Sequence, residues 1–194
     1  MRITTSAIVA GLAVSAMSSA ALAVDYDEAV SGDLSNDRFA PTFIGFDEGL
    51  NTVTMDIIDS NASTGDLDYF TFDIGAGQFI DSISIIDASN PLGGQDSVAF
   101  VGLAFDSIFD FDSIDFSGDG LEGFVLTSPD LFGVNSLGEL SGTNASTLGP
   151  GSYSFWVQQT NTDLTRVTLG VNVVPAPGSL AILGVAAAGL RRRR

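Results

Sequence analysis

Cysteine, histidine and lysine are absent from the 194 residues, and these absences restrict the chemistry open to the chain. Without them the chain cannot form a disulfide, a Ser-His-Asp triad, a Cys-His pair, an imidazole zinc site or a Schiff base on lysine. Most hydrolytic and group-transfer mechanisms therefore lose an essential residue. A carboxylate pair of the glycosidase type remains available, because burial can give two acids different pKa values.

Positive charge is also scarce. Seven arginines stand against 24 acidic residues, and only Arg38 and Arg166 lie away from the chain ends. All the acids fall between Asp25 and Asp163, so 24 acids and two arginines give the central region a net charge of −22. Such a field repels phosphate groups and attracts divalent cations. We therefore exclude nucleic acid as a partner.

The N-terminus has the three parts of a secretory signal peptide. Arg2 gives a positive start, residues 7–16 are almost wholly apolar, and Ala21-Leu22-Ala23 is the small-x-small pattern that signal peptidase cleaves. The pattern predicts a signal peptide over residues 1–23 and a mature chain that begins at Val24. An apolar N-terminal helix retained in the fold is the alternative.

The C-terminus reads Val-Pro-Ala-Pro, then a short apolar run, then four arginines. Residues 178–190 would span about 20 Å as a helix, which is short of the roughly 30 Å hydrocarbon core of a bilayer. Arginine stays on the cytoplasmic side, so the final cluster would stop transfer through the membrane. The cluster that we expect to act in this way is Arg191, Arg192, Arg193 and Arg194.

This tail resembles the PEP-CTERM sorting signal, in which a proline motif, an apolar helix and a basic cluster follow one another. Pro175 and Pro177 match the two prolines of that motif, whereas Ala176 stands where the family usually has glutamate. The resemblance implies that residues 175–194 form the sorting signal. After this tail has been inserted transiently in the inner membrane, an exosortase-type transpeptidase would cut it near Pro-Ala-Pro. The protein would then reach the cell surface or the extracellular matrix. An ordinary tail anchor is the alternative.

Apolar and polar residues alternate in several central segments, which is the pattern of half-buried strands. Glycine-rich or asparagine-rich turn clusters separate these segments. We therefore predict one acidic all-β domain over residues 24–174, an antiparallel β-sandwich of jelly-roll type. The expected strands contain residues 53–57, 70–74, 82–85, 153–157 and 167–173, with a doubly covered strand at 98–105. Most of the 14 phenylalanines are expected in the core.

The middle of the chain resembles the β-sandwich related to bacterial pre-peptidase C-terminal domains. The similarity rests on Asp-x-Asp-Tyr-Phe at residues 66–70, on Gly77-Gln78, and on Gly-x-Tyr-x-Phe-x-Val at residues 151–157. It implies an accessory surface module with no catalytic centre of its own. Residues 106–140 depart from the pattern, and we interpret them as a long insertion or loop.

Acidic residues cluster where the second predicted strand begins. Asp66 and Asp68, with Asp59 nearby in sequence, are candidate calcium ligands, because calcium takes six to eight oxygen ligands. The segment 115–122 is a second candidate, although it lacks the spacing of an EF-hand. Solvated turn aspartates are the alternative at both places.

Three classes of function remain open. The first is a non-enzymatic surface or matrix protein, linked through divalent cations to anionic exopolysaccharide. The second is a carbohydrate-binding module, for which Trp156, the only tryptophan, is the best candidate for stacking on a sugar. The third is a carboxylate-pair glycosidase. We expect the first.

The purified chain should show no hydrolysis of glycans, peptides or esters, and reductant should leave its melting temperature unchanged. Both expectations follow from the absence of Cys, His and Lys. A turnover assay over a substrate panel and a melt with and without reductant measure them. Turnover of any substrate, or a lower melting temperature in reductant, would contradict the prediction.

Overall fold

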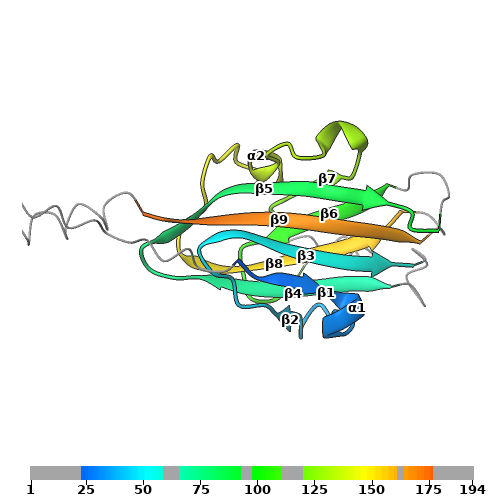
Figure 1. Cartoon of the computed structure of the whole chain (residues 1–194). Helices are drawn as coiled ribbons and strands as arrows, with labels where there is room; N and C mark the ends of the chain where they lie inside the picture. The colour runs from blue at the N-terminus through cyan, green and yellow to red at the C-terminus, as the bar shows by residue number, and fades with distance from the viewer. Residues whose placement is uncertain (1–22, 59–65, 93–97, 111–119, 161–163, 177–194) are drawn as a thin grey trace, which may run out of the picture.

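The computed structural model describes residues 23–58, 66–92, 98–110, 120–160 and 164–176. Within these residues the strands form two sheets, of four and five strands, that enclose one main core (Figure 1). The all-β prediction is therefore confirmed.

The sheets differ in which strands they contain. The first sheet has the order β1 (Asp25–Asp27), β3 (Gly49–Ile57), β9 (Thr165–Pro175), β5 (Gln78–Ser89). The second has the order β2 (Thr42–Phe43), β4 (Leu67–Ile74), β8 (Gly151–Gln159), β6 (Ala99–Ala104), β7 (Gly123–Leu126). The long strands pair antiparallel, but β1 and β2 pair parallel with β3 and β4. A purely antiparallel sandwich is therefore wrong for these two short edge strands.

The core follows the period-two pattern of the sequence. Along β9, for example, Val167, Leu169, Val171 and Val173 are all buried. Alternate residues of β3, β4 and β8 lie in the same core, whereas two register shifts in β5 interrupt the alternation of its core residues. Because side chains of a strand alternate between its two faces, each predicted strand could be placed with its apolar residues inward.

The N-terminal segment passes from one sheet to the other. It leaves β1 in the first sheet, forms the one-turn helix α1 (Glu28–Ser31), and reaches β2 in the second sheet. Asp27 caps α1 by accepting a hydrogen bond from the backbone N–H of Ala29, and Gly32 ends it with φ of 101°. Such a φ is costly for any residue with a Cβ, so glycine allows the sharp exit. This crossing closes one end of the sandwich.

Residues 106–140 contain more than the predicted loop. Their described parts include β7, the 3-10 turn η1 (Pro129–Leu131) and α2 (Leu137–Leu140). Leu137 and Leu140 enter the main core. Phe109 is fully buried in a second apolar cluster with Tyr69, Ala104 and Trp156 on the outer face of the second sheet. The segment is thus part of the folded body, and it covers β6 and β8 from outside.

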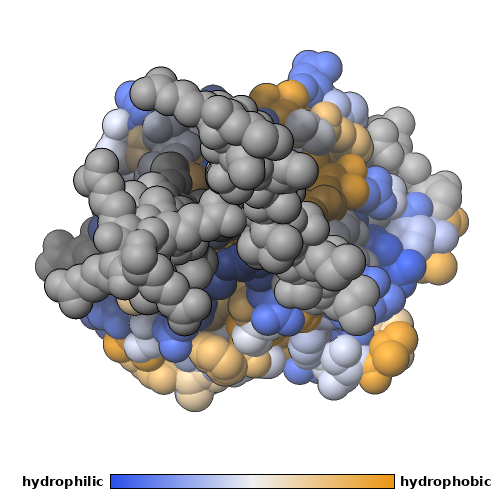
Figure 2. Space-filling view, turned by 60° about the vertical axis from the view of Figure 1, so that its left-hand side comes forward, coloured by the Kyte–Doolittle hydropathy of each residue, from blue (hydrophilic) through white to orange (hydrophobic). Residues whose placement is uncertain are grey.

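The phenylalanines divide between core and surface. Phe70, Phe72, Phe109 and Phe155 are fully buried, but Phe39, Phe43, Phe105 and Phe124 are exposed. The expectation that most phenylalanines pack inside therefore holds for only part of the set. On the face shown in Figure 2, hydrophobic residues lie among hydrophilic ones.

The two ends of the folded body lie close together. A Cβ placed at Gly49 would lie 3.8 Å from the Cβ of Ala23. Gly49 pairs with Val173, two residues before the last residue of β9. The chain therefore enters β1 and leaves β9 at the same end of the sandwich. In Figure 1 the end of β9 and helix α1 lie at opposite ends of the body.

Several sequence predictions fall outside the described residues. These are residues 1–22 with Ala21, the possible ligand Asp59, and residues 177–194 with Pro177 and Arg191 to Arg194. Within the described ranges no helix has the length and hydropathy needed to cross a membrane.

Replacing a core phenylalanine should cost far more stability than replacing an exposed one. Phe155 is fully buried, and its ring stacks on Phe70 at 5.0 Å, whereas Phe43 is 61% exposed. We expect Phe155→Ala to lower the free energy of unfolding by about 3–5 kcal/mol, and Phe43→Ala by about 0.5 kcal/mol or less. Urea denaturation measures both, and equal losses would contradict this assignment of the core.

Candidate metal centre

Asp68 is a carboxylate on the inward side of a strand. It occupies the second position of β4 and has the same phase as Phe70 and Phe72, which lie in the core. Its exposed fraction is 0%, and neither carboxylate oxygen has a hydrogen-bond partner among the described residues. A buried polar group without a partner is costly, and a buried charge costs more. Asp68 is therefore the residue of the core that most needs a ligand.

Glu28 lies opposite Asp68, in the crossing between the two sheets. It is the first residue of α1, and both of its oxygens accept backbone hydrogen bonds. Oε1 accepts from the N–H of Leu34 at 2.8 Å, and Oε2 accepts from the N–H of Asp56, near the end of β3, at 2.7 Å. These two bonds fix the carboxylate and tie α1 to the first sheet.

Asp33 completes a group of three carboxylates. One oxygen from each of Glu28, Asp33 and Asp68 lies within 4.8 Å of the other two. Two oxygens bound to one calcium ion, each at about 2.4 Å, are at most about 4.8 Å apart. Asp33 is exposed, so the group is open to water on one side and closed by Asp68 on the other.

Burial and the charges of neighbouring carboxylates raise the pKa values of Glu28 and Asp68. Burial first, and then the charges of Glu28, Asp66 and Asp33, raise the pKa of Asp68 to about 9. Burial raises the pKa of Glu28 to about 6, against the lowering effect of its two backbone hydrogen bonds. As carboxylates, Asp68 and Glu28 have no hydrogen to share, but a protonated Asp68 can donate to Glu28. The group is thus stable only with a proton or a cation between its members.

The described arginines lie in other interactions. Arg166 forms a bidentate pair with Asp56, with nitrogen–oxygen distances of 2.6 and 2.7 Å. The Nη1 of Arg38 donates to the carbonyl oxygen of Asp110 at 3.0 Å. The charges of Asp33 and Asp66 add to the burial that raises the pKa values of Glu28 and Asp68.

The structure brings together one of the two predicted calcium ligands with two residues that sequence reasoning missed. Asp68 is in the group of three, whereas Asp66 is half-buried beside it and contributes repulsion. The Oδ2 of Asp66 accepts from the N–H of Ile58 at 3.4 Å. The inward phase of Asp68 was visible in the sequence, but no spacing joins it to Glu28 and Asp33. Only the crossing between the sheets does so.

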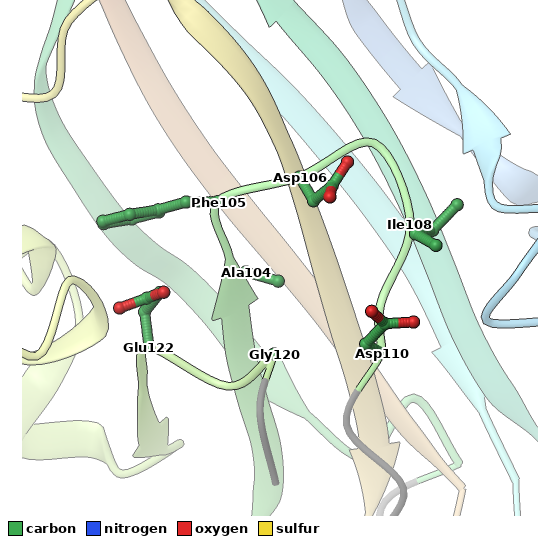
Figure 3. A pocket seen from close by; sticks show the side chains of 7 residues that line it. All are labelled: Ala104, Phe105, Asp106, Ile108, Asp110, Gly120 and Glu122. Atoms are coloured by element: carbon green, nitrogen blue, oxygen red, sulfur yellow. The ribbon is translucent and has the colours of Figure 1, made fainter.

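The second predicted calcium segment contributes to a different feature. Its residues 115–119 lie outside the described residues, but Gly120 and Glu122 line a pocket of about 110 Å³ with Asp106 and Asp110 (Figure 3). Figure 3 shows the three carboxylates lying apart around the pocket. They do not form a group of metal-ligand spacing among the described residues. The prediction for residues 115–119 lies outside the described residues and stays a prediction.

Trp156 is not available for stacking on a sugar. It is 2% exposed and packs against Phe100, Phe109 and Tyr69, with ring centroids 4.7, 5.6 and 6.0 Å away. The residue that was the best candidate for stacking is therefore covered by other aromatic rings. The reason is that residues 109 and 121, from the segment interpreted as a loop, cover this face of β8.

Comparison of the chain with protein family models, with curated proteins and with solved structures finds no match. The two family resemblances of the sequence therefore stay predictions, and the site is interpreted from its own geometry.

The stability of the metal-free chain should fall as pH rises from about 4 to about 9. The unfolded carboxyls have pKa values of about 4, whereas Glu28 and Asp68 reach about 6 and about 9 in the folded chain. Between these values the folded state binds more protons, so increasing pH favours the unfolded state. Urea denaturation in a chelator at several pH values measures the slope.

A variant and its control separate this effect from general repulsion. Asp68→Asn should flatten the pH dependence, because it removes the most strongly shifted group. Asp73→Asn changes the net charge equally on the same strand but at an exposed position, so it should keep the slope. The same slope in Asp68→Asn and in the unmodified chain would contradict the prediction.

Proposed function

We propose that this chain is a non-enzymatic exported protein of the cell surface or extracellular matrix, sorted through its C-terminal tail by an exosortase-type transpeptidase. One observation supports it best: both ends of the folded body lie at the same end of the sandwich. Ala23 lies beside Gly49, and Gly49 pairs with Val173 near the end of β9.

This arrangement suits a protein held by a membrane at both ends during export. A signal peptide before Val24 and an apolar tail after Pro177 would both reach one membrane surface from one end of the body. The sandwich, about 36 Å along β9, can then fold outside without a terminal segment crossing its length. The carboxylate group lies at the opposite end, beside α1, and would face away from that membrane.

The boundaries of the fold agree with the proposed processing points. The N–H of Val24 donates to the buried Asn51 side chain at 3.1 Å, and Val24 packs against the core. The N–H of Ala176 donates to the carbonyl oxygen of Gly77 at 2.6 Å. Signal peptidase would leave Val24 in the fold, and a cut near Pro-Ala-Pro would spare β9.

The acidic charge of the folded body indicates which kind of partner the mature protein would bind. A central region with a net charge of −22 should bind divalent cations, which can bridge it to anionic exopolysaccharide. The sandwich would serve as an accessory module related to pre-peptidase C-terminal domains, and its jelly-roll subtype stays a prediction. Sugar binding through Trp156 and a glycosidase using Asp68 are weaker alternatives, because both side chains are buried.

Protein isolated from the organism that makes it should begin at Val24 and lack Arg191 to Arg194. The expectation rests on the Ala-Leu-Ala site and on the order proline motif, apolar run, arginine cluster. Intact-mass spectrometry measures both ends at once. Replacing Pro175 and Pro177 by alanine together should leave the N-terminal cut unchanged and reduce C-terminal processing. A mature protein that keeps the arginine cluster would contradict the sorting proposal.

A further inference from the structure

The strongest unassigned feature of the molecule is a gap between opposing carboxylates where its two sheets meet. Asp68 points inward from the second sheet, and Glu28 is held to the first sheet through the N–H of Asp56. Asp33 lies at the open side. The observation that separates this group from other surface acids is the complete burial of Asp68 without a hydrogen-bond partner among the described residues.

We propose that one calcium ion binds among Glu28, Asp33 and Asp68 and joins the two sheets at the end of the sandwich that lies away from the C-terminal exit. This inference goes beyond the proposed function and does not depend on how the tail is processed.

The ligand chemistry favours calcium over other metals. All three side chains offer only oxygen, and the chain has no Cys or His to supply a softer ligand. Calcium accepts carboxylates in one- or two-oxygen mode with flexible geometry, whereas magnesium demands a near-octahedral shell and keeps its waters. The exposed position of Asp33 leaves room for water to fill the remaining positions of a calcium shell.

The ion would fix the N-terminal crossing to the body. Polar contacts with both sheets hold residues 28–36: the N–H of Asp56 in the first sheet donates to Glu28, and in the second sheet the N–H groups of Leu67 and Tyr69 donate to Asn36 and to the carbonyl of Ser35. Repulsion among the three carboxylates opposes these contacts when no cation is present. A bound cation removes that repulsion and adds bonds that only the folded chain can form.

Calcium binding to the purified chain provides the first test. After treatment with a chelator, titration calorimetry should find one tightly bound calcium ion per chain in the unmodified protein and in the Asp73→Asn control. Asp68→Asn and Asp33→Asn should each weaken binding at least tenfold. Asp33 is exposed, so Asp33→Asn keeps the test valid if Asp68→Asn does not fold. Strong binding unchanged in both variants, or no strong binding in the unmodified chain, would overturn the proposal.

Thermal melts separate a site from general screening of charge. At free calcium 100 times the dissociation constant, the ratio of folded to unfolded chain should rise about 100-fold. Magnesium, and sodium at matched ionic strength, should raise the melting temperature less. Equal shifts in all three salts would mean diffuse screening and would overturn the site.

Hydrogen exchange tests the joining of the sheets. Calcium should slow exchange most at the amides of Leu34, Asp56 and Tyr69, and little at the β5–β9 ladder away from the site. The Asp73→Asn control should show the same protection, and Asp33→Asn should lose it. Binding without local protection would overturn the claim that the ion fixes the crossing.

Discussion

A carboxylate that points into a core needs a proton or a cation, and much of this molecule is arranged around that requirement. Asp68 follows the same strand phase as Phe70 and Phe72, so it cannot turn to solvent without moving β4. Glu28 faces it from the crossing between the sheets, with its own oxygens held by two backbone N–H groups. The result is an acidic end on a mainly apolar interior, at the place where the two sheets are joined by the chain.

The second sheet is covered on its inner face and on part of its outer face. Inside lies the main core, and outside Phe109 and Leu121 pack over Tyr69, Phe100 and Trp156. This explains why β6 reads as a continuous apolar run, and why β8 buries residues of both phases. An alternating pattern is typical of a strand with one solvent-exposed face. Where a strand is covered on both faces, its sequence does not show which residues point into the main core.

The predictable part of the site and the unpredictable part have different physical origins. The inward position of Asp68 follows from the two-residue period, because it lies two and four residues before core phenylalanines. The participation of Glu28 and Asp33 follows from the parallel pairing of β1 with β3 and of β2 with β4. Pairings of such short strands leave no periodic signal, since two or three residues cannot define one. The burial of Trp156 was not predictable for a related reason: its cover comes from a segment with no strand pattern.

The sequence alone determined the class of the fold, the phase of the long strands and the excluded chemistries. Those properties depend on local alternation and on which residue types exist at all, and both are written directly in the chain. The tertiary structure decided which acids meet, which aromatic side chains are covered, and that Ala23 lies near the end of β9. Most of these contacts join segments that are far apart in sequence, such as Asp33 and Asp68, or Gly49 and Val173. They are set by sheet order and by the crossing of the N-terminal segment rather than by any local preference.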